Sequence, residues 1–360
     1  PLLLAGLLLI CFSARQVAAQ DQDLHSIADT SYFKTGDDDW NLVESVLRGS
    51  QSNVLFLLKR GANPDAEAEG GMTALMYAAE LGDTMLVKLL VLNGADLELT
   101  HVEGTTPLLV AILNQHFKVA QYLLEKGANP DHQDDYKGNG LLYAAAMNDY
   151  TLADLLLFYG ASDSIRDKDG NGALMTAVFF GNIETADVLL QNGLEPDATD
   201  KKKNTPLMIA AQQGNRDLIF LLLEYGAGLE RVNAKNYTAL AHAIRYEQDS
   251  AAMILIDSGA DIHHQITPNR NLYDLAVQHN QKKIQKLLKE HGAGPLVRPD
   301  FSRIDFGWGN SFRNNEHLMQ VRVSWVDRKF GFFAETGFDF RPVYRKVQVA
   351  EDNSLIYQYR

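Results

Sequence analysis

The sequence predicts a mostly α-helical solenoid of about eight 33-residue helix-turn-helix units, followed by a short antiparallel β segment. Glycines recur every 33 residues, at Gly61, Gly94, Gly127, Gly160, Gly193, Gly226, Gly259 and Gly292. A second motif, Thr-Pro-Leu-Met at 205–208, repeats with the same step. A fixed period of this length is the signature of a solenoid whose units are a turn and two helices. After residue 317 the hydrophobic period becomes two, which is typical of strands.

The unit around residues 205–226 shows how each element is specified. Thr205 can cap the first helix, and Pro206 suits its first helical position, where a missing N–H has no cost. Gly214 and Asn215 are predicted to turn the chain into the second helix, which Gly226 ends in a left-handed conformation. The apolar stripes consist of Leu207, Ala210 and Ala211 in the first helix and Leu218, Leu221, Leu222 and Leu223 in the second. No unit can bury this surface alone, so we expect one core built by stacking.

These motifs resemble those of the ankyrin-repeat family over residues 37–293. The resemblance implies a non-catalytic scaffold that binds proteins with its turn tips and the ends of its first helices, which line a concave face. One position departs from the family pattern, because the usual histidine after Thr-Pro-Leu is replaced. The residues there are Met76, Leu109, Leu142, Met175, Met208, Ala241 and Asp274. We therefore expect apolar packing to replace the hydrogen bonds that this histidine makes between adjacent turns.

The period of this chain locates the helix ends that the resemblance implies for partner binding. The predicted protein-binding residues are Met147, Phe179, Phe180, Gln212, Gln213, Arg245 and Tyr246. Aromatic residues, Met and Arg are the residue types that anchor protein interfaces. The alternative is that Phe179 or Phe180 packs against the next unit.

The charge and composition exclude several classes of function. The formal net charge is −13 and the sequence pI is about 5.2. Nucleic acid is therefore not the expected partner, because phosphate binding needs clustered Lys and Arg. The chain shows no phosphate-cradling glycine loop and no hydrolase nucleophile elbow. We expect no enzyme activity and no cofactor.

Three further motifs have both a functional and a structural interpretation. Residues 167–172 resemble the opening of a calcium loop, but Val178 stands where the bidentate glutamate belongs, so a structural turn is expected. His242 and the pair His263-His264 lack partners at metal-ligand spacing, which favours packed or solvated histidines and no metal site. The basic run 201–203 is expected to be a solvated turn tip.

The N-terminal residues predict export from the cell. An apolar run at 2–14 precedes small residues at positions 17 and 19, as in a cleaved secretory signal at 1–19, followed by a linker at 20–36. The chain begins at Pro1 without a methionine, so we expect a fragment that lacks the basic start of the signal. Cys11 is the single cysteine, and a mature chain without disulfides is compatible with a bacterial periplasm. The alternative is a cytosolic adaptor that retains residues 1–19.

The C-terminal residues predict a linker at 294–316 and strands over 317–360. Met319, Val321, Val323 and Trp325 alternate with polar residues, and similar alternation follows to Tyr359. This segment resembles the opening strands of a Gram-negative outer-membrane β-barrel. A few strands cannot close a barrel, so that interpretation requires the chain to continue beyond Arg360. The alternative is a small soluble sheet that packs on the last repeat.

Together these features predict an exported bacterial protein of the periplasm or outer membrane. Its function would be to bind an unidentified protein on the concave face, with an outer-membrane association through residues 317–360. One alternative is an outer-membrane pore or transport component with a periplasmic repeat domain. The other is the soluble cytosolic adaptor.

Overall fold

The computed structural model describes residues 33–34, 36–68 and 70–296, together with strand segments at 301–313, 316–327, 332–340, 345–348 and 355–358. The chain divides into two parts, Pro1–Gly294 and Pro295–Arg360. The predicted signal peptide at 1–19 and nearly all of the predicted linker at 20–36 lie outside the described residues.

The described helices of the first part form eight pairs, which we number as units 1 to 8. In order, the pairs are α2 (Asp38–Leu47) and α3 (Gln51–Arg60), α4 (Ala74–Leu81) and α5 (Thr84–Leu92), α6 (Pro107–Leu113) and α7 (Phe117–Glu125), α8 (Gly140–Met147) and α9 (Tyr150–Phe158), α10 (Ala173–Phe180) and α11 (Ile183–Gln191), α12 (Pro206–Gln213) and α13 (Arg216–Glu224), α14 (Ala239–Arg245) and α15 (Asp249–Asp257), and α16 (Leu272–Gln278) and α17 (Lys282–Glu290). The predicted solenoid of eight helical units is thus confirmed. None of the described helices has the length and apolar character that crossing a membrane requires.

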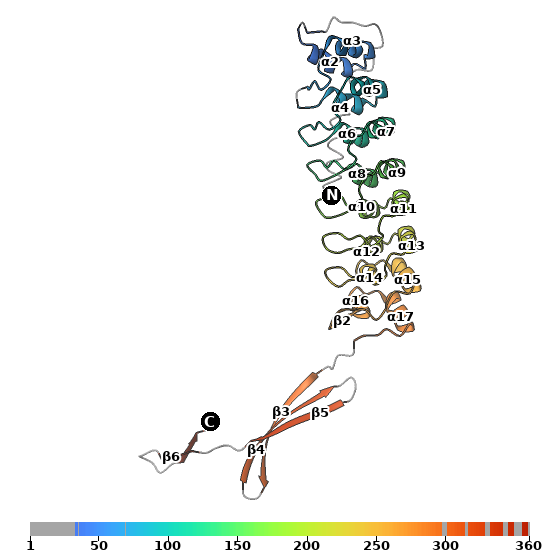
Figure 1. Ribbon diagram of the computed structural model, residues 1–360. Coiled ribbons are helices and arrows are strands. Elements are labelled where there is room, and N and C mark those ends of the chain that lie inside the picture. Colours follow the sequence, from blue (N-terminus) through green and yellow to red (C-terminus); the bar gives the residue numbers. More distant parts are fainter. Residues whose placement is uncertain are drawn as a thin grey trace. The chain divides into compact units, whose positions relative to one another are not determined.

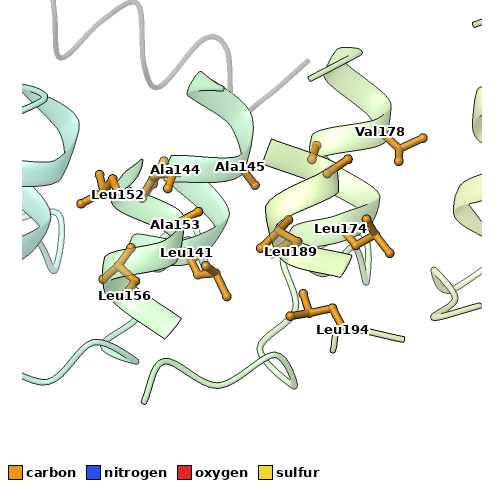
Figure 2. Close-up of a cluster of buried hydrophobic side chains, with 14 of the residues drawn as sticks. Leu141, Ala144, Ala145, Leu152, Ala153, Leu156, Leu174, Val178, Leu189 and Leu194 are labelled. Atoms are coloured by element: carbon orange, nitrogen blue, oxygen red, sulfur yellow. The ribbon is translucent and has the colours of Figure 1, made fainter. Parts of the chain in front are cut away.

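The units stack in chain order. Each first helix packs against the first helix of the next unit, and each second helix packs against the next second helix. In Figure 1 the second helices form one layer, and the turns lie on the opposite side of the first helices. Figure 2 shows part of the resulting core in units 4 and 5, where Leu141 and Leu156 belong to one cluster with Leu174 and Leu189. These leucines are at most 2% exposed, so stacking removes their surface from water.

The predicted cap residues begin the first helices. The Thr205 hydroxyl accepts a hydrogen bond from the Met208 N–H, and Thr73, Thr106 and Thr238 act in the same way on their own helices. Gly172 stands at this position in unit 5, where no side chain caps α10. Six of the seven residues that replace the family's histidine are buried, Met76 and Met208 among them, as the expected apolar packing requires. The seventh, Asp274, is half-buried, and its carboxylate accepts the Asn271 N–H at 3.4 Å.

Backbone conformation, and not a lack of room for a side chain, requires glycine at the positions with the 33-residue spacing. Each lies just after a second helix with φ between 81 and 97°, the left-handed region that disfavours L side chains. A Cβ added at any of them would meet nothing within 4 Å. The predicted left-handed end at Gly226 is therefore confirmed, with φ 81°.

Hydrogen bonds between consecutive units form a regular ladder beside these glycines. A carboxylate of one unit accepts the backbone N–H of the residue 31 positions later. The bonds run from Asp96 N to Asp65, Asn129 N to Glu98, Ser162 N to Asp131, Gly228 N to Asp197 and Asp261 N to Glu230, at 2.7–2.9 Å. Within the described units, the series has a gap at Ser164, whose hydroxyl contacts the Ser162 hydroxyl at 2.7 Å instead. Unit 5 therefore lacks both a ladder carboxylate and a helix cap.

The C-terminal part contains antiparallel strands. β3 (Phe301–Arg313), β4 (Glu316–Asp327) and β5 (Phe332–Phe340) form one sheet, and β6 (Arg345–Gln348) pairs with β7 (Leu355–Gln358). The last repeat unit adds a small hairpin of β1 (Gln265–Thr267) and β2 (Arg270–Asn271) before α16.

The linker predicted at 294–316 was wrong over 301–313, which form β3. Its glycines and nearby Pro299 concealed an alternation of Ile304, Phe306 and Trp308. The register pairs Phe306 with Val323 and Trp308 with Val321, so the apolar positions of β3 align with those of β4. Glycines stand at alternate positions of β3, and the strand tolerates them because it is paired with β4. The local sequence does not reveal this pairing. The membrane-barrel interpretation of these strands stays a prediction.

The gap in the ladder predicts that Ser164→Asp stabilises the array. A carboxylate at 164 would accept the Glu195 N–H, as its counterparts do in other units. We expect the free energy of unfolding in urea to rise by about 0.5–1 kcal/mol. Ser162→Asp adds the same charge without a ladder partner and should give no such gain. Equal effects from the two variants would contradict this explanation.

Candidate protein-binding face

The ends of the first helices carry large apolar side chains that the stack leaves exposed. Leu81, Phe179 and Tyr246 lie at the ends of α4, α10 and α14 and are 47%, 48% and 42% exposed. In two units, a backbone carbonyl near the end of the first helix is held by a side chain of the following unit. The Glu80 carbonyl contacts His116 Nε2 at 2.8 Å, and the Ala145 carbonyl accepts from Asn182 Nδ2 at 2.7 Å. The backbone at the ends of α4 and α8 is thus held by two units at once.

Phe179, Phe180 and Gln213 form one cluster between units 5 and 6. The two phenyl rings are 5.3 Å apart between centroids and perpendicular, an arrangement that aromatic pairs prefer. Gln213 donates its amide N–H to the Phe179 carbonyl at 2.7 Å. Phe180 is half-buried while Phe179 is exposed. Phe180 is therefore less accessible than Phe179, and the packing of either ring against the next unit stays a prediction.

Met147 and Gln212 are less available than their neighbours. Both side chains are half-buried, and Met147 packs against the hydrophobic core. Met147 thus combines a structural contact with partial exposure at the surface. Whether any of the predicted residues contacts a partner stays a prediction.

Arg245 and Tyr246 form a second cluster with two residues of the same unit. The Arg245 guanidinium lies 5.3 Å from the Tyr237 ring centre and 5.8 Å from that of Tyr246. The Tyr246 ring stacks on His242 with 6.1 Å between centroids. Tyr237 and His242 are buried. Arg245 therefore packs on the fixed ring of Tyr237, and the exposed Tyr246 packs on that of His242. Such a pre-ordered cation and aromatic ring lose little side-chain entropy on binding.

The hydrogen bonds of Asn233 determine the tautomer of His242. The Asn233 carbonyl oxygen accepts the backbone N–H groups of Lys235 and Tyr237, at 2.9 and 3.0 Å. Its amide nitrogen therefore faces His242 Nε2 at 3.0 Å, and Nε2 must accept. The proton of the neutral ring then lies on Nδ1, which is buried without a hydrogen-bond partner among the described residues.

The pKa of His242 is lowered to about 4, chiefly by burial and also by the positive charge of Arg245. The carboxylate of Asp200 acts in the opposite direction. A protonated Nε2 would also confront the Asn233 amide, donor against donor. His242 is therefore a neutral packing residue, which agrees with the structural interpretation made from the sequence.

The loop that resembles a calcium site is a turn in the structure. The Asp167 carboxylate accepts the backbone N–H groups of Asp169 and Asn171 at 2.9 and 2.7 Å, which leaves it committed to the turn. Among the described residues, no group of three or more His, Cys, Asp or Glu side chains could hold a metal ion.

Sequence reasoning missed the residues that organise these clusters. Tyr237 precedes the cap Thr238, where the period indicated only a turn. Its ring reaches the end of α14 through Arg245, a contact that spans the whole first helix. An aromatic residue directly before a helix cap could have signalled such support.

A family model confirms the repeats. The model described as "Ankyrin repeats (3 copies)" matches residues 42–134, 128–200, 174–266 and 207–299. The solved ankyrin repeat domain of Bcl-3 superposes with a TM-score of 0.57 at 24% identity, covering 60% of this chain and 97% of that one. At this level of identity the likeness shows the fold alone.

Curated relatives match over short stretches. Ankyrin repeat protein L371 of Acanthamoeba polyphaga mimivirus is 31% identical over 121 residues, which is 33% of this chain and 16% of that protein. Protein phosphatase 1 regulatory subunit 27 of Mus musculus is 35% identical over 80 residues, 22% of this chain and 52% of that protein. The chain therefore spans a small part of the first relatives that it matches, and their whole-protein activities do not transfer directly.

The buried His242 predicts a loss of stability in mild acid. Because its folded pKa lies below the unfolded value of 6.5, protonation favours the unfolded chain. This stability is complete above pH 6.5 and is lost as the pH falls toward about 4. His242→Ile, which places there the residue found at 209, should remove about 2 kcal/mol of the difference in unfolding free energy between pH 7 and pH 5.

Urea unfolding of the full chain at both pH values measures this difference. His263→Asn, at an exposed histidine, serves as the matched control and should leave the difference unchanged. An unaltered pH difference in His242→Ile would show that other groups cause the acid sensitivity.

Proposed function

Because this chain belongs to the ankyrin-repeat family, we propose that it is a non-catalytic scaffold that binds a protein partner on the face formed by its first helices and turns. Ankyrin repeats generally serve as protein-interaction modules, which supports the general assignment. The observation that carries the specific site is the exposure of Phe179 and Tyr246 on supports held by their neighbours.

The chemistry of this face suits binding rather than catalysis. Its exposed residues are aromatic, amide and guanidinium groups, which anchor interfaces by burying area and donating hydrogen bonds. The histidine in the face is neutral and buried, and its Nε2 atom is occupied by Asn233. A general base must reach the proton of a bound substrate, and His242 does not meet that requirement.

We further propose that the protein is located in the cell envelope. The apolar run at 2–14 followed by small residues supports export to the periplasm of a Gram-negative bacterium. The alternating strands β3, β4 and β5 support an outer-membrane association of the C-terminal part. On this proposal the array would display its binding face in the cell envelope.

The proposed site predicts that a double change, Phe179→Ser with Tyr246→Ser, abolishes partner capture. Immobilised full-length protein would be exposed to envelope extract, and the bound proteins compared by mass spectrometry. Two central aromatic anchors are each worth about 2 kcal/mol or more, so we expect at least a hundredfold loss of affinity.

The matched control is Phe158→Ser, because Phe158 is 80% exposed on the second-helix layer. It should retain the same bound proteins. Loss with Phe158→Ser and retention with the double variant would place the binding site on the opposite side.

Export predicts that the mature protein starts at Gln20 and fractionates with the envelope. The measurement is fractionation of a Gram-negative host that expresses the full-length protein, with N-terminal sequencing. Outer-membrane material supports the tether, and soluble periplasmic material supports export without it. Cytosolic protein that retains residues 1–19 would contradict the proposed location.

A further inference from the structure

The turn tips of four consecutive units carry a concentration of lysine in an acidic protein. The tips are residues 135–137, 168–170, 201–203 and 234–236, in the turns that precede α8, α10, α12 and α14. Their exposed lysines are Lys137, Lys168, Lys201, Lys202, Lys203 and Lys235. Only two acidic residues, Asp135 and Asp169, share these tips, whereas the whole chain has a net charge of −13.

The acidic residues at the base of these turns are committed to the fold. Asp134 accepts the backbone N–H groups of Tyr136 and Gly138, both at 2.9 Å, and Asp200 accepts those of Lys202 and Asn204 at 2.8 and 2.7 Å. These carboxylates therefore serve the turn. Among the ion pairs of the described residues, none includes a tip lysine.

Neighbouring tips are fixed to one another. The Lys201 N–H donates to the Asp169 carbonyl at 3.4 Å, and the Lys201 ammonium donates to the Lys168 carbonyl at 2.5 Å. The Ala234 N–H donates to the Lys202 carbonyl at 2.9 Å. The tips at 168–170, 201–203 and 234–236 thus form a connected row, so the spacing of their lysines is set before any partner arrives.

The tips border the aromatic face described above. The Lys168 ammonium lies 5.2 Å from the centre of the exposed Tyr136 ring, which adds an aromatic group to the row of tips. Tyr237 directly follows the tip at 234–236. Its ring contacts Arg245 and so connects the row of tips to the end of α14. Charge and aromatic surface therefore meet on one side of units 4 to 7.

We infer that the tip row binds an extended acidic segment of the protein partner, an inference that rests on the function proposed above. Packed helices lie about 8–10 Å apart, which sets the step between tips. A polyproline II segment advances about 9 Å in each three-residue turn. Acidic side chains at every third residue would therefore meet successive tips. The opposite charges would also orient the partner on an otherwise negative protein.

A protein segment suits this row better than nucleic acid does. Asp135 and Asp169 interrupt the lysines, and no arginine stands at the tips. A nucleic acid presents a phosphate at every step and draws its affinity from many neutralised charges. A single row with separated acidic groups instead favours a chain whose negative charges are spaced.

The test measures binding of fluorescent peptides to the full chain by polarisation. One peptide of about 12 residues, the length that reaches four tips, carries Glu at every third position among Ala and Pro. A second has the same composition with its Glu residues in one block. We expect the spaced peptide to bind at least about threefold more tightly, with an affinity that falls as salt rises.

The variant for this test combines Lys168→Gln, Lys202→Gln and Lys235→Gln, one change at each of three tips. Exposed ion pairs contribute factors of about two to three each, so the affinity should fall about tenfold. The matched control combines Lys59→Gln, Lys118→Gln and Lys283→Gln, exposed lysines of second helices with the same total charge change. It should leave the affinity unchanged.

Several outcomes would overturn the inference. They are equal binding of the two peptides, equal losses in the two triple variants, or tighter binding of duplex DNA than of the spaced peptide.

Different results would contradict the proposed function and the inference about the acidic segment. If partner capture needs Phe179 and Tyr246 but not the tip lysines, the binding face stands and the acidic segment is wrong. If the spaced peptide binds through the lysines but capture does not need the aromatic residues, the proposed face is wrong.

Discussion

Stacking between units is the interaction on which the rest of this structure depends. Each unit has a leucine-rich surface on two sides, and helices of seven to ten residues are too short to be stable alone in water. Leu156 and Leu189 are fully buried within the continuous core that the stacked units share. The constant 33-residue step follows from this requirement, since an insertion would displace one leucine stripe from the next.

The same stacking determines what the surface can do. Side chains at equal positions of successive units become neighbours, so a residue type repeated at one position produces a row. Polar bonds then fix the row in place, as with Gln213 on the Phe179 carbonyl and Lys201 on the Lys168 carbonyl. Departures from the repeat have local consequences: Gly172 and Ser164 leave unit 5 without a cap and a ladder bond. Phe179 thus lies in a unit that lacks both of these contacts.

Much of the array could be predicted from the sequence because its signals are local and repeated. Thr205 as a cap and Gly226 as a left-handed end depend on adjacent residues only, and the period multiplies that information eightfold. The candidate site was harder to predict. The exposure of Phe179 depends on the next unit, and the contact between Tyr237 and Arg245 crosses an entire helix. β3 was missed because its glycines suggested a linker, while its pairing partner lies in a different segment.

Site-specific photo-crosslinking tests the central claim, that the first-helix face is the binding surface, most directly. A photoreactive residue would replace Phe179 or Tyr246, and separately Phe158 or Phe220 of the second-helix layer, in the full-length protein within its own cells. If this face binds the partner, positions 179 and 246 give one common adduct and positions 158 and 220 give none. Adducts that form only from the second-helix positions would contradict it.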